Sequence, residues 1–208
     1  MKEPVNALTH FVMFLGGFVA LGLLLHKAWG SAGAVIVGLI FGLSIITLYG
    51  ASTLYHWLRA TPRWELILRK LDHISIYFLI AGTYTPVLYY GLQGLWKWAM
   101  LVTVWVLSAV GALLKVWLVD ISRVLTAGFY LSLGWLAVIP FGQLWKSLAK
   151  PALVLLLAGG AAYTLGAVIY ATKIFNFKPN RFGFHEVFHI FVGVGTILHF
   201  LMIYLFVM

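Results

Sequence analysis

Long apolar runs separated by short polar segments dominate this chain of 208 residues. Seven runs lie at about residues 7–25, 34–57, 71–90, 95–117, 124–144, 152–172 and 184–208. Each is near the length of about 20 apolar residues that a helix needs to cross the hydrocarbon core of a bilayer. The apolar residues are continuous instead of alternating, which is typical of membrane helices and not of transmembrane barrels. The pattern predicts an all-α, polytopic membrane protein, a bundle of seven transmembrane helices that forms one domain over residues 1–208.

The composition excludes several classes of protein. Apolar residues make up 63% of the chain and charged residues 9%, whereas an ordinary soluble domain has about 25% charged residues. A soluble enzyme and a disordered chain are therefore excluded. The chain contains no cysteine, which excludes disulfides, thiolate nucleophiles and Cys-ligated zinc. Any metal site must then use His, Asp or Glu.

The basic residues predict an orientation in the membrane. Seven spans would place the N-terminal tail on one side with the loops after the second, fourth and sixth runs. Ten of the fourteen Lys and Arg lie on that side: Lys2, Arg59, Arg63, Arg69, Lys70, Lys115, Arg123, Lys173, Lys178 and Arg181. The other four are Lys27, Lys97, Lys146 and Lys150. The positive-inside rule then places the N-terminus in the cytoplasm and the C-terminus outside.

The net charge of +9 is explained by the same residues, which lie between apolar runs and anchor the loops at lipid headgroups. We therefore expect no nucleic-acid partner. In the loop after the second run, Thr61 and Pro62 are typical of a helix start. They predict a short helix on the inner leaflet before the third span.

Four ionisable residues from three different runs lie at one predicted membrane level. His56 ends the second run, Asp72 begins the third, and His185 and His189 begin the seventh. All four lie at the cytoplasmic face in the predicted topology. Because an ionisable side chain within a bilayer is energetically unfavourable, each of them needs a partner.

The spacing of these residues favours a metal site. His185 and His189 are separated by one helical turn and share a face, so they can bind one ion together. His56 is the natural third ligand, and a three-His set leaves the open position that is typical of catalytic zinc. Ser52 lies one turn from His56, where its hydroxyl can bind a water or a substrate carbonyl. Asp72 lies at a helix N-terminus and can act as a general base.

Alternatives to this hypothesis remain open at the level of the sequence. A single His at a helix end is more often an interfacial residue. His185 to His189 also matches the H-E-x-x-H motif, in which Glu186 would activate water in an intramembrane metalloprotease. We interpret His10 as a structural residue or a neighbour of the site, and His199 as a hydrogen-bonded interior residue.

The chain resembles bacterial hemolysin III proteins, which belong to the progestin and adipoQ receptor (PAQR) family. The residues that carry the resemblance cover nearly the whole chain: Asn6, Thr9-His10, Ser52-Thr53-Leu54-Tyr55-His56, Leu71-Asp72-His73-Ile74, Ala81-Gly82-Thr83-Tyr84-Thr85-Pro86, Tyr130, Gly134-Trp135 and His185-x3-His189. Related alkaline ceramidases share the S-x3-H, D and H-x3-H constellation. Glu186 is not part of the family's motif, which weakens the protease interpretation.

The resemblance implies that His56, His185 and His189 bind Zn²⁺. It also implies that Ser52 and Asp72 accompany the metal, with Asp72 acting through a water instead of directly on the ion. Seven spans with a cytoplasmic N-terminus are implied as well, in a multi-pass protein of the bacterial cytoplasmic (inner) membrane. No adiponectin-type extracellular partner is implied.

Three functions from different classes follow. The first is a zinc-dependent hydrolase of a lipid amide or ester, similar to ceramide hydrolysis, with a membrane lipid or fatty-acyl ligand in the helix bundle. The second is a non-enzymatic sensor or regulator of membrane homeostasis, in which zinc joins the second and seventh spans. The third is a cytolysin. It is the weakest of the three, because few polar residues are available to line a pore. No protein partner or oligomer is indicated.

Overall fold

The computed structural model describes residues 1–178 and 182–208, and these residues are predominantly helical. Arg181, counted above among the basic residues, lies outside the described residues. The elements are α1 (Pro4–Lys27), α2 (Ala32–Trp57), α3 (Pro62–Gly91), α4 (Gly94–Trp117), α5 (Arg123–Gly134), the 3₁₀ helix η1 (Trp135–Val138), α6 (Phe141–Ser147), α7 (Lys150–Thr172), α8 (Phe184–Met202) and the π-helix η2 (Ile203–Val207). The described residues contain no strand beyond one isolated bridge between Lys178 and Phe182. The all-α prediction is confirmed.

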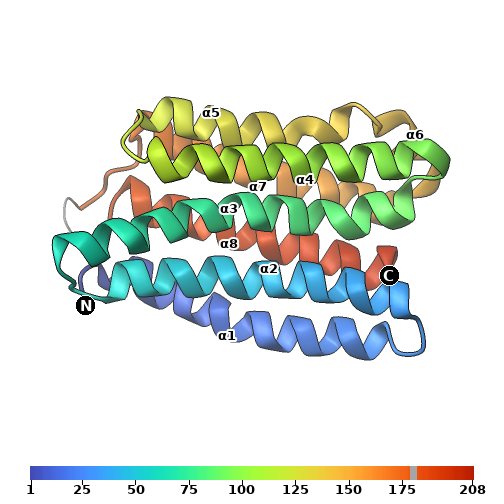
Figure 1. Cartoon of the computed structure of the whole chain (residues 1–208), viewed down its shortest axis with the longest axis horizontal. Helices are drawn as coiled ribbons and strands as arrows, with labels where there is room; N and C mark the ends of the chain where they lie inside the picture. Colours follow the sequence, from blue (N-terminus) through green and yellow to red (C-terminus); the bar gives the residue numbers. More distant parts are fainter. Residues whose placement is uncertain (179–181) are drawn as a thin grey trace.

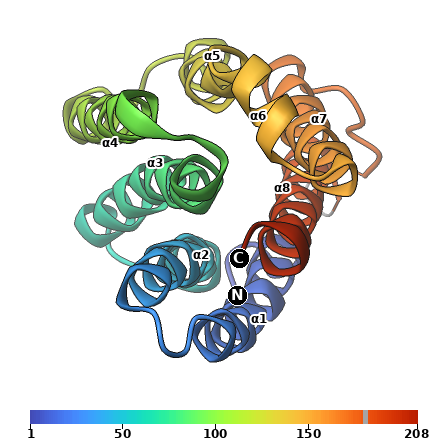
Figure 2. The same ribbon diagram turned by 90° about the vertical axis from the view of Figure 1, so that its right-hand side faces the viewer.

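The long helices run side by side along one axis (Figure 1), and the two chain termini lie at opposite ends of the bundle. Viewed from one end, successive helices follow one another around a ring (Figure 2). Helix α1 packs against α2, α2 against α3, α3 against α4 and α7 against α8, and contacts between α1 and α8 close the ring. This order brings the end of α2 and the start of α8 to the same end of the molecule.

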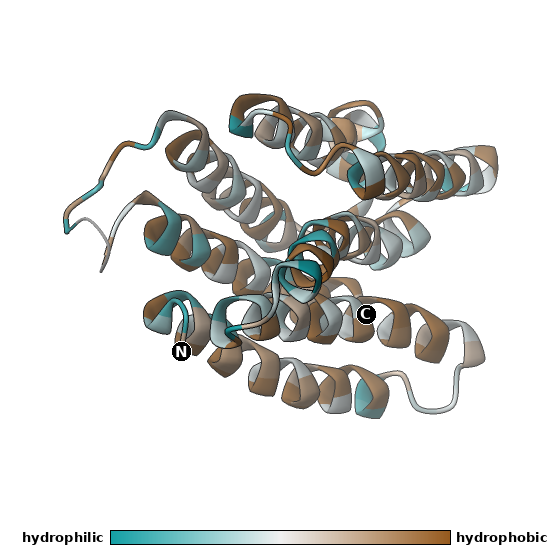
Figure 3. Ribbon diagram, turned by 60° about the vertical axis from the view of Figure 1, so that its left-hand side comes forward, coloured by the Kyte–Doolittle hydropathy of each residue, from teal (hydrophilic) through white to brown (hydrophobic). Residues whose placement is uncertain are grey.

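The surface of the bundle is suited to lipid. Hydrophobic residues predominate along the helices and hydrophilic ones gather near their ends (Figure 3). In the part of the chain that the structure describes, five helices are long and apolar enough to cross a membrane: α1, α2, α4, α7 and α8 continued by η2. The segment from α5 through α6 meets the same criteria as one broken span, bent by 55°. Helix α3 runs beside α2 and α4 but is more polar, so the count of seven spans stays a prediction.

The start of α3 agrees only in part with the short helix predicted before the third span. The helix does begin at Pro62, directly after Thr61. However, the separate interfacial helix is a wrong prediction, because the 30 residues of α3 are continuous. The prediction that Asp72 lies at a helix N-terminus is wrong for the same reason, since Asp72 lies about three turns inside α3 and gains nothing from the helix dipole. Polar residues in its first turns, including Glu65 and Arg69, pair with residues at the same end of the bundle: Glu65 with Lys2, and Arg69 with Asp120.

The fifth predicted span, residues 124–144, is interrupted between η1 and α6. Pro140 has no backbone N–H to donate, so a regular helix cannot continue through it. The break leaves backbone groups that a membrane interior does not satisfy. The hydroxyl of Tyr84 on α3 supplies part of what is missing, since it donates to the Gly134 carbonyl (2.6 Å) and accepts from the Ala137 N–H (2.8 Å).

Helices α2 and α3 approach each other closely at Gly82, which lies within the Ala81–Pro86 segment. A Cβ atom on Gly82 would lie 2.2 Å from Ser44 Oγ and 2.5 Å from Ser44 Cβ. The Ser44 side chain is itself buried and bound to the Phe41 carbonyl. A side chain on Gly82 would therefore push the two helices apart.

We expect Gly82→Ala to destabilise the protein by about 1–3 kcal/mol, the usual effect of overpacking a tight core. The measurement is the thermal unfolding midpoint in detergent. Gly22→Ala in α1 is the matched control, because no atom outside its own helix lies within 4 Å of a Cβ added there among the described residues. A midpoint for Gly82→Ala equal to that of Gly22→Ala would contradict the close contact between α2 and α3.

Candidate metal centre

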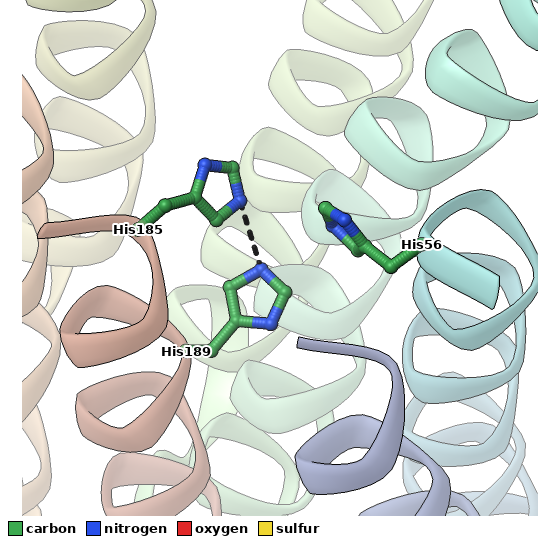
Figure 4. A group of neighbouring side chains, drawn as sticks. All are labelled: His56, His185 and His189. Carbon is green, nitrogen blue, oxygen red and sulfur yellow. Dashed lines mark hydrogen bonds between the residues drawn. The ribbon is translucent and has the colours of Figure 1, made fainter. Parts of the chain in front are cut away.

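Three imidazoles from two helices converge at one end of the bundle (Figure 4). His56 lies in the last turn of α2, and His185 and His189 lie in the first turns of α8. One nitrogen of each ring lies within 4.8 Å of the other two. The Nε2 atoms of His185 and His189 are only 3.0 Å apart. The structure thus brings together the three histidines that the sequence predicted as neighbours, in an arrangement that could hold a metal ion.

The rings of His56 and His189 lie in the interior of the protein. His56 is fully buried and His189 is 3% exposed. The Nε2 atom of His56 is buried and has no hydrogen-bond partner among the residues that the structure describes. A buried polar atom without a partner typically destabilises a fold by about 1–3 kcal/mol. Because imidazole nitrogen suits zinc and other borderline divalent ions, a metal fits this donor set.

Glu3 contacts the His56 ring on its Nδ1 side, which the sequence pattern does not predict. Its Oε2 lies 2.7 Å from His56 Nδ1. This hydrogen bond is the main reason that the pKa of Glu3 is lowered, to about 2. Asn6 donates a second hydrogen bond to the same Glu3 oxygen (2.9 Å). In the sequence, Glu3 and Asn6 stand three residues apart before the first apolar run. This spacing alone does not indicate that Glu3 contacts His56.

Ser52 and Asp72 share a cavity with two of the histidines. Asp72 is 8% exposed and Ser52 1% exposed, and both line the same cavity as His185 and His189. Within residues 1–178 and 182–208, the Ser52 hydroxyl makes no hydrogen bond. Ser52 and Asp72 therefore present a hydroxyl and a carboxyl group to this cavity.

The carboxylate of Glu186 is hydrogen-bonded to protein groups through both of its oxygens. Its Oε2 accepts a hydrogen bond from the Gly183 N–H (2.7 Å), which caps the N-terminus of α8. Its Oε1 accepts one from Asn6 Nδ2 (2.9 Å). Both carboxylate oxygens are thus already bound to protein groups, which weakens the interpretation of Glu186 as the base of a metalloprotease.

Two further buried histidines, His10 and His199, differ in their contacts. His199 Nε2 lies 3.1 Å from the Leu156 carbonyl, which confirms the prediction of a hydrogen-bonded interior residue. The His10 ring stacks on the His189 ring, with centroids 3.8 Å apart and an interplanar angle of 16°. His10 supports one face of His189 and so is a neighbour of the cluster.

A cavity of about 200 Å³ extends from the histidines into the bundle. Its wall is mainly apolar and comes from α3, α5, α7 and α8, with smaller contributions from α1 and α2. On α8 the lining residues run from His185 to His199, a distance of about 21 Å at 1.5 Å per residue. That exceeds the roughly 15 Å thickness of one leaflet of a bilayer's hydrocarbon core. The cavity is therefore elongated along α8 and has a mainly apolar wall.

Comparison with known proteins shows which family the chain belongs to. The family model "Haemolysin-III related" matches residues 1–200. The chain is similar to "Hemolysin-3" of Bacillus cereus (33% identical, covering all of this chain and 92% of the relative) and to "Hemolysin-3 homolog" of Bacillus subtilis (36% identical, covering 94% and 89%). It is also similar to "Adiponectin receptor protein" of Drosophila melanogaster, at 29% identity over 80% of this chain and 41% of that protein. This chain therefore belongs to the haemolysin-III-related family of multi-pass integral membrane proteins, which has relatives among the adiponectin receptors.

Proposed function

We propose that this protein is a zinc-dependent hydrolase of a lipid amide or ester that acts at the cytoplasmic leaflet. The observation that carries the proposal is the convergence of three imidazoles, two of which, those of His185 and His189, line one end of an apolar cavity. Two further polar residues, Ser52 and Asp72, lie in the wall of that cavity. A lipid whose acyl chain occupied the cavity would present its headgroup linkage to these residues.

The roles of the side chains follow from their chemistry. His56, His185 and His189 would hold Zn²⁺, which in such a site supplies an activated water and polarises a carbonyl. Asp72 would accept a proton from the attacking water as general base. The Ser52 hydroxyl would donate a hydrogen bond to the substrate carbonyl. The apolar wall of the cavity would exclude bulk water, which strengthens each of these interactions.

A second function, the sensing of membrane composition without turnover, has one observation in its favour. The candidate ligands come from α2 and α8, so a metal ion would join these two helices. A bound metal then acts as a structural clamp and contributes to the stability of the fold. The apolar wall of the cavity favours an acyl chain over an aqueous pore, which leaves a cytolysin as the weakest of the three functions.

We also propose that all of α1, α2, α3, α4, α5 with α6, α7 and α8 cross the membrane, with the N-terminus in the cytoplasm of a bacterial cell. The support is the position of α3 among the spanning helices and the location of the termini at opposite ends of the bundle (Figures 1 and 2). The excess of basic residues at the N-terminal end of the bundle also favours this orientation.

Reporter fusions test the topology. A reporter placed after Val207 should report a location outside the cytoplasm. A reporter inserted between α2 and α3, at residues 58–61, should report a cytoplasmic location. The reason is the odd number of spans combined with the positive-inside rule. A C-terminal reporter with a cytoplasmic signal would show that one of the seven segments does not cross the membrane.

Asp72 and Glu186 separate the lipid hydrolase from the metalloprotease. We expect Asp72→Asn to retain zinc and to lose lipid turnover by about 10²–10⁴-fold, because an amide cannot accept the proton. Glu186→Gln should lower turnover much less than Asp72→Asn, since the amide oxygen can still accept the hydrogen bond from Gly183 and only the bond from Asn6 is lost. The measurement is zinc content and turnover of a lipid extract, with both variants and wild type in the same detergent.

A protease would give the reverse result, with activity lost in Glu186→Gln and retained in Asp72→Asn. Full turnover in Asp72→Asn would overturn the proposed role of Asp72 even if zinc were bound. Absence of lipid turnover in zinc-loaded wild type, together with a lower unfolding midpoint in His185→Ala, would favour the structural clamp.

A further inference from the structure

We infer that Glu3 is the positioning residue of the metal centre: its carboxylate fixes the tautomer of His56 and aims the free Nε2 of that ring at His185 and His189. The inference rests on the proposed metal site and deepens it, because it assigns a role to a residue outside the three-His set.

The N-terminal segment is attached to the end of α2 by main chain as well as side chain. The Glu3 N–H donates to the His56 carbonyl (2.9 Å), and the Lys2 N–H donates to the Trp57 carbonyl (3.3 Å). These bonds satisfy carbonyls in the last turn of α2, which have no partner within their own helix. They also hold the Glu3 side chain beside the His56 ring.

The direction of the hydrogen bond follows from the chemistry of the pair. An ionised carboxylate only accepts hydrogen bonds. The 2.7 Å contact between Glu3 Oε2 and His56 Nδ1 therefore requires the proton on Nδ1. In the neutral imidazole the lone pair is then left on Nε2, which is a buried atom that has no hydrogen-bond partner in the described part of the chain. Histidines that bind metals commonly donate their other N–H to a carboxylate in this way, which fixes the ring and raises its basicity.

Asn6 extends the same control to α8. Its side chain is fully buried, and its Nδ2 donates both to Glu3 (2.9 Å) and to Glu186 (2.9 Å). Glu186 in turn caps the first turn of α8, beside His185. The Asn6 amide on α1 therefore connects the Glu3 carboxylate with the Glu186 carboxylate. Glu3 orients His56, and Glu186 caps the helix that carries the other two histidines.

Zinc affinity provides the first test. Metal-free wild type, Glu3→Ala and Glu3→Gln are titrated with Zn²⁺ against a competing chelator in the same detergent. We expect Glu3→Ala to bind zinc about 10–100-fold more weakly, as is usual when a group that orients a metal ligand is removed. Glu3→Gln should fall between wild type and Glu3→Ala, because its amide oxygen still accepts the hydrogen bond from Nδ1 but carries no charge.

The matched control is Glu65→Ala. Glu65 has the same charge, lies at the same end of the bundle and makes a partly exposed ion pair with Lys2 (2.7 Å). Its removal should leave zinc affinity nearly unchanged, because this ion pair does not include a histidine of the cluster and a pair near the surface contributes little. An equal loss of affinity in Glu65→Ala and Glu3→Ala would reduce the effect to one of net charge and would overturn the inference.

The tautomer of His56 provides a readout that needs no metal and no turnover. Nitrogen NMR of ¹⁵N-histidine-labelled, metal-free protein should show His56 protonated on Nδ1, with the signal assigned by its absence in His56→Gln. The Nδ1-protonated form should be lost in Glu3→Ala and retained in Glu3→Gln. Retention of this tautomer in Glu3→Ala, or protonation on Nε2 in wild type, would overturn the role of Glu3.

The two proposals can fail separately. A wild-type protein with the expected tautomer but without zinc affinity would overturn the proposed function and support the positioning of His56 by Glu3. Zinc binding of wild-type strength in a folded Glu3→Ala variant would leave the metal site in place and overturn the inference about Glu3.

Discussion

The requirement that buried polar groups find partners inside the protein governs this fold, because a bilayer interior offers no water to replace them. The contact between α2, α7 and α8 illustrates it. The hydroxyls of Tyr49 and Tyr163 both meet Thr196 Oγ1, at 2.7 and 2.8 Å, and Thr196 also binds the Val192 carbonyl in its own helix. At the broken span, the Tyr84 hydroxyl serves the same purpose for two backbone groups. Side-chain hydroxyls thus join helices whose surfaces are otherwise apolar.

The histidine cluster departs from this rule, and that departure gives it functional meaning. The Nε2 of His56 and the Nδ1 of His189 lie in the same interior and are paired with nothing in the described residues. The carboxylate of Glu3 and the amide of Asn6 nevertheless hold the site in a defined arrangement. A fold that holds one nitrogen of each of three imidazoles within 4.8 Å of the other two, with the Nε2 of His56 unpaired, is preorganised for a cation. The adjacent apolar cavity then determines what kind of molecule can reach that cation.

Much of the architecture was predictable because a bilayer imposes a simple length and polarity on each helix. The three histidines were predictable because helix ends that face one side of a membrane lie at one depth. The interruption of residues 124–144 was not predicted, because the Tyr84 hydroxyl that stabilises it comes from a distant part of the chain. The roles of Glu3 and Glu186 were missed for the same reason: their partners lie far away in sequence or depend on where a helix begins.

The most direct test of the metal centre is zinc X-ray absorption spectroscopy on protein purified without chelators, combined with elemental analysis. We expect about one zinc per chain, bound by three imidazole nitrogens at about 2.0–2.1 Å and one further light atom. The spectrum should lose its imidazole contribution in a variant with His185 and His189 both changed to Ala. Purified wild-type protein that contains no zinc and cannot take it up, or that binds zinc equally well without these two histidines, would contradict the account.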